Sequence, residues 1–72
     1  MCMEYNFKNN KIAELRQALN FSQLRLAKEL NTSQANISRW EKALIEPSIS
    51  ECWKMADFFG VTIDYLCGRI DY

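Results

Sequence analysis

Hydrophobic residues in the first half of the chain recur at intervals of three and four, which is the spacing of one face of an α-helix. Two such stripes predict helices over residues 9–19 and 23–30. We expect both stripes to pack into one core, because an amphipathic helix is stabilised mainly by burial of its apolar face. The stripe residues are Ile12, Leu15, Leu19, Leu24, Ala27 and Leu30.

The second half shows the same spacing in three further segments, which predict helices over residues 34–42, 49–59 and 63–67. No stretch alternates steadily between apolar and polar residues as a half-buried strand does, and glycine and proline are scarce. The fold class is therefore all-α, with five short helices. The side chains expected to face inward are Ile37, Trp40, Glu41, Ile49, Cys52, Met55, Ala56 and Phe59.

Residues that cap helices stand where the predicted helices begin and end. A serine or threonine hydroxyl just before a helix can accept a hydrogen bond from a free backbone N–H group of the first turn. Glycine and asparagine tolerate the left-handed conformation that often follows a helix. Ser48 and Glu51 also have the spacing of a capping box. The start residues are Ser22, the pair Thr32-Ser33, Ser48 and Thr62, and the end residues are Asn31, Gly60 and Gly68.

The helices over residues 23–30 and 34–42 are joined by only three or four residues, which is typical of a helix-turn-helix. Ala27 supplies a small side chain where two steeply crossing helices approach. The second helix leaves a polar face outside the core. Glutamine and asparagine can each pair with adenine through two hydrogen bonds, and arginine can do so with guanine. The outward residues are Gln34, Ala35, Asn36, Ser38 and Arg39.

Four runs of the chain resemble the Cro/repressor-type (Xre-like) helix-turn-helix family. They are SQLRLAKEL at 22–30, TSQANISRWE at 32–41, PSI at 47–49 and ADFFGVTIDYL at 56–66. The resemblance covers residues 7–68 in order and with the expected spacings. It implies a compact five-helix, lambda-repressor-like domain that binds double-stranded DNA. Members of this family mostly act as transcriptional repressors and bind palindromic operators as homodimers.

The resemblance also implies roles for individual residues. Positions that contact bases are occupied by Gln34, Ala35, Asn36 and Arg39. Gln23 occupies a position that contacts a phosphate, where the helix dipole assists. Weaker candidates for contacts to the DNA backbone are Arg25, Lys28, Ser38 and Lys42. Arg16 and Glu41 match positions that form an ion pair between the first and third helices, which we interpret as structural.

The loop at residues 43–46 departs from the family pattern. That loop usually contains glycine and basic residues that contact phosphate, whereas here it is Ala-Leu-Ile-Glu. We therefore expect weaker DNA binding with a shallow salt dependence, because each lost phosphate contact removes about one unit of slope.

The charges are unevenly distributed along a chain whose net charge is zero. Residues 7–44 hold seven basic and three acidic residues, a net charge of +4, and the remaining residues hold two basic and six acidic residues, a net charge of −4. A basic surface could thus meet DNA while acidic residues point away.

Other classes of function find little support. The chain has no histidine, no glycine-rich phosphate loop and no pairing of a nucleophile with a base, so we expect neither an enzyme nor a metal, cofactor or small-molecule site. No apolar run is long enough for a membrane span. Three cysteines without a Cys-x-x-Cys pair predict reduced thiols in a cytoplasmic protein, in preference to a disulfide or metal role. Those cysteines are Cys2, Cys52 and Cys67, of which the last two should pack as small hydrophobes.

A protein-interaction module on the same fold, such as an antitoxin-like partner, is the alternative hypothesis. Trp53 lies off the main apolar stripe of its helix, and Leu44 and Ile45 lie in a loop, so all three could be exposed at an interface with a protein. The neutral net charge also fits this alternative. We expect residues 1–6 to be a flexible N-terminus, residues 7–68 the domain and residues 69–72 a C-terminal tail.

Overall fold

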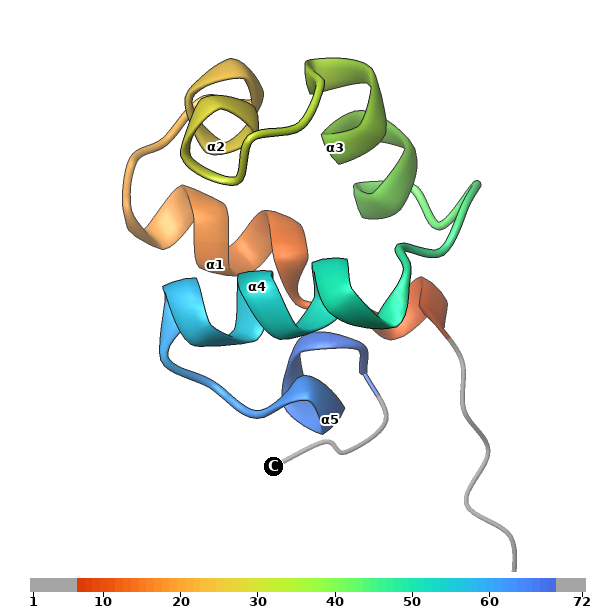
Figure 1. Cartoon of the computed structure of the whole chain (residues 1–72). Coiled ribbons are helices and arrows are strands. Elements are labelled where there is room, and N and C mark those ends of the chain that lie inside the picture. Colours follow the sequence, from red (N-terminus) through yellow and green to blue (C-terminus); the bar gives the residue numbers. More distant parts are fainter. Residues whose placement is uncertain (1–6, 69–72) are drawn as a thin grey trace, which may run out of the picture.

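The computed structural model describes residues 7–68, and this part of the chain is all-helical (Figure 1). The five α-helices and the all-α class predicted from the sequence are confirmed. One short 3-10 helix precedes them. The expectations for residues 1–6, for residues 69–72 and for Cys2 lie outside the described residues. The elements are η1 (Phe7–Asn9), α1 (Ile12–Ala18), α2 (Gln23–Glu29), α3 (Gln34–Glu41), α4 (Ile49–Phe59) and α5 (Ile63–Leu66).

Each predicted cap at a helix start is confirmed. The hydroxyls of Ser22, Ser33, Ser48 and Thr62 each accept a hydrogen bond from the backbone N–H group three residues further along the chain. In return the Ser48 backbone N–H donates to the Glu51 carboxylate, which completes the capping box. These bonds satisfy donors that helix geometry leaves unpaired, so they define where α2 to α5 begin.

The ends of α1, α2 and α3 share one geometry. In each, a residue with positive φ follows the helix, at Asn20 (59°), Asn31 (58°) and Ala43 (60°). After α2, the Thr32 N–H donates to the Ala27 carbonyl at 2.8 Å and the Asn31 N–H to the Lys28 carbonyl at 3.2 Å. This pair of bonds is the Schellman motif. The left-handed conformation predicted for Asn31 is confirmed. The same conformation at Ala43 was not predicted, because alanine rarely adopts it.

The core contains most of the predicted inward residues, with three corrections. Leu24 is 49% exposed, and Leu26, two residues later, is fully buried in its place. Leu19 and Ile49 are also exposed. The buried residues are Phe7, Ile12, Leu26, Ala27, Leu30, Ile37, Trp40, Cys52, Met55, Ala56, Leu66 and Cys67.

The corrections have a geometric cause. Residues 26, 27 and 30 form a helical face as regular as residues 24, 27 and 30, so the spacing alone could not choose between Leu24 and Leu26. Leu19 and Ile49 stand at helix ends, at the C-cap of α1 and the first residue of α4. A side chain at a helix end has packing partners on fewer sides than one in the middle of the helix.

The two ends of the described region meet. The Lys11 N–H, just before α1, donates to the Leu66 carbonyl of α5 at 2.8 Å. Gly68 has a φ of +78°, and a Cβ atom there would lie 2.4 Å from the carbonyl of Asn9. Glycine is therefore required at this position both for its φ and for the close backbone approach. In Figure 1, α4 crosses the middle of the molecule, with α2 and α3 above it and α5 below.

Candidate nucleic-acid interface

The two helices of the predicted helix-turn-helix pack against each other with their connecting turn at the surface (Figure 1). Ala27 is 1% exposed, in agreement with the expected need for a small side chain at the crossing. The Schellman motif after α2 and the Ser33 cap before α3 leave only four residues between the helices. Local hydrogen bonds thus hold both ends of the turn between α2 and α3.

One side of α3 faces solvent and the other faces the core. Ile37 and Trp40 are buried, at 0% and 3% exposure. Gln34, Ala35 and Arg39 are exposed on the opposite side. Asn36 and Ser38 lie at the edges and are partly buried. A turn of 3.6 residues places the four predicted base-contacting residues on one continuous surface, which we call the α3 polar face.

Asn36 is held in place by the turn before it. Its Nδ2 donates to the Thr32 hydroxyl at 3.0 Å, and its backbone N–H donates to Ser33 Oγ at 3.1 Å. The side-chain amide has a second N–H and a carbonyl oxygen that this bond does not use. Those are the donor and acceptor that an asparagine needs to pair with the edge of adenine.

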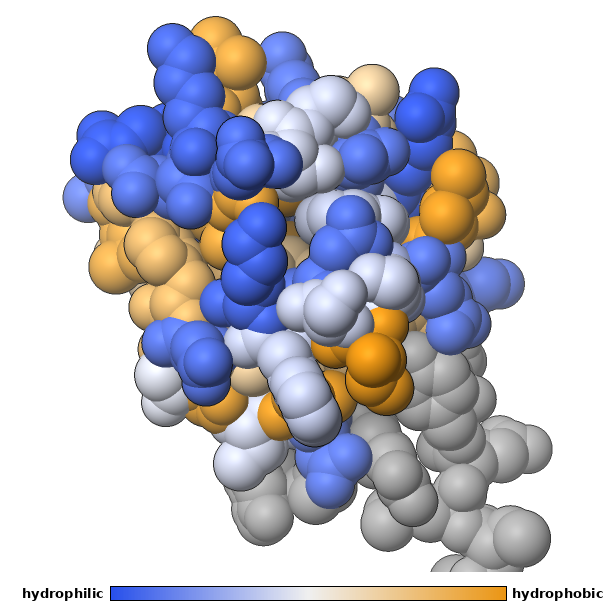
Figure 2. Space-filling model, viewed as in Figure 1, coloured by the Kyte–Doolittle hydropathy of each residue, from blue (hydrophilic) through white to orange (hydrophobic). Residues whose placement is uncertain are grey.

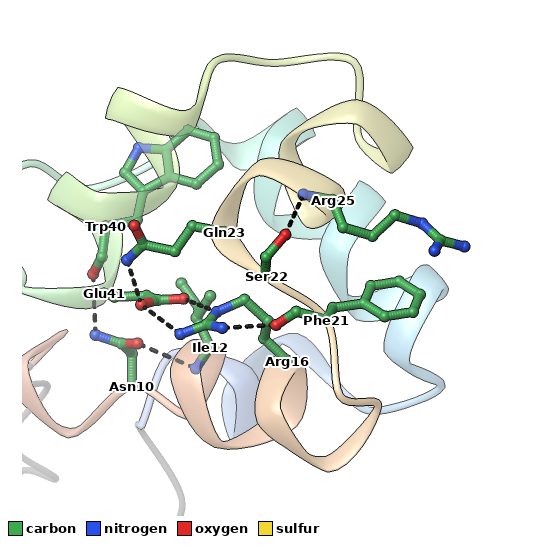
Figure 3. A network of polar contacts seen from close by, with 9 residues as sticks. All are labelled: Asn10, Ile12, Arg16, Phe21, Ser22, Gln23, Arg25, Trp40 and Glu41. Atoms are coloured by element: carbon green, nitrogen blue, oxygen red, sulfur yellow. Dashed lines mark hydrogen bonds and ion pairs between the residues drawn. The ribbon is translucent and has the colours of Figure 1, made fainter.

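A network of polar contacts ties the end of α3 to α1 and α2 (Figure 3). Arg16 Nε contacts Glu41 Oε2 at 2.6 Å, which confirms the predicted ion pair, and Arg16 Nη1 donates to the Phe21 carbonyl at 2.7 Å. Gln23 Nε2 donates to Glu41 Oε1 at 2.9 Å. One carboxylate at the last residue of α3 thus joins the first three α-helices.

Asn10 was missed by sequence reasoning. Its Nδ2 donates to the carbonyl of Phe7 at 2.7 Å. The same Nδ2 donates to the carbonyl of Trp40 at 3.2 Å, and its Oδ1 accepts from the Ile12 N–H at 3.1 Å (Figure 3). It therefore binds the first backbone N–H of α1, whose N-cap residue is Lys11, and also binds the end of α3.

The predicted phosphate-contacting cations differ in their surroundings. Arg25 lies over the Phe21 ring at 4.5 Å, and its Nε contacts Glu29 Oε2 at 3.0 Å. Both partners of this ion pair are exposed, so water screens it. Lys28 and Lys42 are exposed as well. Lys42 is the C-cap of α3.

The loop between α3 and α4 exposes apolar side chains. Leu44 is 71% exposed and Ile45 is 51% exposed. The loop has no basic residue between positions 43 and 48. Its exposed surface therefore lacks the cations with which a loop would contact phosphate.

The two cysteines of the described region pack as the small hydrophobes that the sequence predicted. Cys52 and Cys67 are buried free thiols, with their sulfur atoms 3.8 Å apart. Burial raises the pKa of the Cys67 thiol to about 12, and the neighbouring Cys52 adds to the rise. Burial also raises the pKa of Cys52, partly offset by its hydrogen bond with Cys67. Both thiols are thus stabilised in their neutral form.

Sites for other kinds of ligand are poorly developed in residues 7–68. No three or more acidic or cysteine side chains gather there in a way that could hold a metal ion. A cavity of about 30 Å³ lies beside Trp40 and Lys54, far below the ~300 Å³ of a usual ligand pocket. No helix in this region has the length and apolar character needed to cross a bilayer.

Comparison with known proteins agrees with this geometry. A family model described as helix-turn-helix matches residues 12–66. No solved structure gave a significant match.

Several curated transcriptional regulators are similar to this chain. The transcriptional activator BcrR of Enterococcus faecalis is 38% identical over 81% of this chain and 28% of its own length. The transcriptional repressor RstR of the cryptic phage CTXphi of Vibrio cholerae is 32% identical over 82% of this chain and 53% of its own length. An uncharacterized HTH-type transcriptional regulator of Methanocaldococcus jannaschii is 40% identical over 76% of this chain and 83% of its own length.

The chain spans about half or less of the length of BcrR and RstR. The matched region here includes α2, α3 and the turn between them, whose geometry is that of a helix-turn-helix. This chain therefore belongs to the Xre/Cro-like helix-turn-helix family of DNA-binding transcriptional regulators.

Proposed function

We propose that this protein binds a specific sequence of double-stranded DNA by placing the α3 polar face in the major groove. The observation that carries the proposal is the division of α3 into a buried side and an exposed side rich in hydrogen-bonding groups. The Arg16–Glu41–Gln23 network supports it, because it holds the recognition helix rigidly against the rest of the domain. A rigid support keeps base-contacting side chains in their productive geometry.

In this proposal each residue of the α3 polar face has a defined partner. Gln34 and Asn36 bond to adenine, Arg39 bonds to guanine, and the Ala35 methyl group contacts thymine. The second N–H of the Asn36 amide makes this pairing compatible with its bond to Thr32.

Contacts to the DNA backbone come from the surrounding residues. Gln23 uses the amide hydrogen that Glu41 does not accept. Arg25, Lys28, Ser38 and Lys42 complete the set and fix the orientation on the duplex.

We further propose that two copies bind a palindromic operator and act as a repressor in the cytoplasm. A two-fold dimer presents two recognition helices about 34 Å apart, which corresponds to half-sites one helical turn apart. Occupancy of the operator alone suffices to exclude another protein from the same DNA, whereas activation requires an additional contact. The similar protein RstR is a transcriptional repressor. The proposal assigns no catalytic step to any residue.

Selection of bound sequences from a pool of random duplexes tests this function. We expect enrichment of an inverted repeat whose half-sites are centred 10–11 base pairs apart. Enrichment of a single half-site would support base recognition and contradict the dimer. No enrichment at low salt, with a protein shown to be folded by circular dichroism, would refute sequence-specific binding.

A protein-interaction module with weak DNA binding is the second candidate function. The observation that favours it is the set of exposed apolar side chains after α3 and on α4, together with a net charge of zero. Affinity purification at low salt separates the two functions. Recovery of one protein partner in a 1:1 ratio, with no retention of DNA, would favour the second.

A further inference from the structure

The side chain of Asn36 has a hydrogen-bonding partner within the chain, unlike its polar neighbours on the α3 polar face. Its Nδ2 donates to the Thr32 hydroxyl at 3.0 Å. Within residues 7–68, the exposed side chains of Gln34 and Arg39 make no such bond. Figure 2 shows that hydrophilic residues predominate over the upper part of the molecule, where α2, α3 and their turn lie in Figure 1. In this polar region the Asn36 amide is oriented before any ligand binds.

Thr32 is firmly placed in the turn between α2 and α3. Its backbone N–H donates to the Ala27 carbonyl at 2.8 Å, as part of the Schellman motif after α2. Its side chain is partly buried and lines a small cavity together with Leu30 and Trp40. The branched Cβ also restricts rotation about χ1. The hydroxyl oxygen that Asn36 contacts therefore has a nearly fixed position.

The bond between Asn36 and Thr32 is not needed to begin α3. Ser33 is the N-cap, and its hydroxyl accepts from the Asn36 backbone N–H at 3.1 Å. The Thr32 hydroxyl accepts from a side-chain amide instead, so it satisfies no backbone donor of the helix. Without this bond a partly buried amide can still bond to water, so the bond contributes little to stability. Its main effect is on the orientation of the Asn36 side chain.

The orientation of a carboxamide decides which base edge it can pair with. In the major groove adenine presents N7 as an acceptor and its N6 amino group as a donor. Asparagine matches this edge with one N–H and Oδ1, and rotation of the amide by half a turn exchanges the two groups, so that acceptor meets acceptor. Because Thr32 accepts one amide hydrogen, the second N–H and Oδ1 remain for a base in one defined orientation.

We propose that Thr32 is a positioning residue that determines the base specificity of Asn36. Its hydroxyl holds the Asn36 amide in the orientation that fits adenine before DNA is bound. A side chain that is already oriented loses less conformational freedom on binding than a free one. The proposal rests on the proposed function, because it requires that Asn36 contact a base.

Two substitutions of Thr32 separate the hydroxyl from the shape of the side chain. Thr32→Val removes the hydroxyl and keeps the branched shape, whereas Thr32→Ser keeps the hydroxyl and removes a methyl group. Neither change alters a charge or the backbone bond to Ala27. We therefore expect both variants to be folded by circular dichroism and to keep the wild-type salt dependence of binding.

Nuclear magnetic resonance relaxation of the free protein tests the contact without DNA. We expect the order parameter of the Asn36 Nδ2 group to be near the rigid value of about 0.85 in the wild type and in Thr32→Ser. In Thr32→Val it should fall below about 0.6, the range of flexible groups. A wild-type value as low as that of Thr32→Val would overturn the proposal.

Affinities for the selected operator and for its single-base-pair variants measure the effect on specificity. The base pair read by Asn36 is the one at which Asn36→Ala loses its preference. At that pair we expect Thr32→Val to reduce discrimination about fivefold, the factor that one net hydrogen bond contributes. Thr32→Ser should restore discrimination to the wild-type level. The preference at the base pair read by Arg39 should be unchanged in both variants.

A double-mutant cycle separates positioning from a general structural effect. In an Asn36→Ala background, Thr32→Val should cause no further loss of discrimination. The positioning role would be overturned if Thr32→Val weakened all duplexes equally, kept the preference at the Asn36 base pair, or acted equally with and without Asn36. The proposed DNA recognition would still stand in these cases. Unchanged preferences in Asn36→Ala would overturn the inference by showing that Asn36 contacts no base, and a wild type without sequence-specific binding would refute the proposed function as well.

Discussion

Arg16 and Glu41 form an ion pair across the space between α1 and the last residue of α3, with Nε and Oε2 2.6 Å apart. Their side chains are only 12% and 8% exposed, so water screens the pair weakly. Arg16 Nη2 also donates to Glu41 Oε1 at 3.3 Å, Arg16 Nη1 donates to the Phe21 carbonyl, and the Gln23 amide donates to Glu41 Oε1. The position of the recognition helix thus depends on a satisfied, largely buried charge pair.

Glu41→Ala should lower the free energy of unfolding by about 3–5 kcal/mol, because it leaves the Arg16 guanidinium buried without its counter-charge. Urea denaturation followed by circular dichroism measures the change. Glu29→Ala is the matched control, since Glu29 forms an exposed ion pair with Arg25. That change should cost about 0–1 kcal/mol. Equal costs for the two variants would contradict a special role for the buried pair.

Arg39→Ala should weaken binding to the selected operator by about 1–3 kcal/mol and relax the preference at one base pair in each half-site. The physical reason is the loss of two hydrogen bonds to a guanine edge. Repeating the duplex selection with the variant measures both effects. Lys28→Ala provides the comparison, because loss of a phosphate contact should weaken all sequences about equally. An unchanged preference in Arg39→Ala would show that Arg39 does not contact a base.

The starts of α2 to α5 could be predicted because local interactions determine them, whereas the first helix, expected from residue 9, begins only at Ile12. Ser22, Ser33 and Thr62 bond to backbone groups three residues away, so their effect is contained in a few neighbouring positions. The turn at Asn31 is likewise a local preference of that residue type. Most of the framework that positions α3 is therefore determined by short segments of sequence.

Other features depend on contacts between segments distant in sequence. The choice between Leu24 and Leu26 for the core depends on how α2 is rotated against its neighbours, which the spacing of apolar residues leaves open. Asn10 contacts the Trp40 carbonyl thirty residues away, and no local pattern indicates such a contact. The Arg16–Glu41 pair, whose members are 25 residues apart, could be predicted only through the resemblance to a family.

Binding to DNA should depend on salt less steeply than is usual for a protein of this kind. Three cations, Arg25, Lys28 and Lys42, are the candidates for phosphate contacts in one subunit, and the loop at 43–46 adds none. A slope of log K against log salt of about −0.9 per contact then gives roughly −3 for one half-site. Fluorescence anisotropy with a half-site duplex between 50 and 300 mM salt measures it.

The same titration on two variants checks the assignment of the salt slope. Lys28→Ala should make the slope shallower by about one unit, whereas Gln34→Ala should leave it unchanged, because a neutral side chain displaces no counterion. A half-site slope of −6 or steeper in the wild type would mean that further cations contact the duplex. A slope unaffected by Lys28→Ala would remove that residue from the set.

The stability of the domain should fall as the pH rises above 9, because the pKa of Cys67 is raised to about 12 in the folded chain from an ordinary value of 9.0. Between these values the unfolded thiol loses its proton while the folded one keeps it. Unfolding therefore releases a proton, and the free energy of unfolding decreases by at most about 1.4 kcal/mol per pH unit for this group. Below pH 8 the contribution of Cys67 to the free energy of unfolding is fully present and constant.

Urea denaturation at pH 7.5, 9, 10 and 10.5 is compared between the wild type and Cys67→Ala. The difference between the two proteins isolates the effect of the Cys67 thiol, since both share every lysine and tyrosine. The wild type should lose more stability over this range than the variant does, and parallel curves would show that the Cys67 thiol ionises as readily in the folded chain as in the unfolded one.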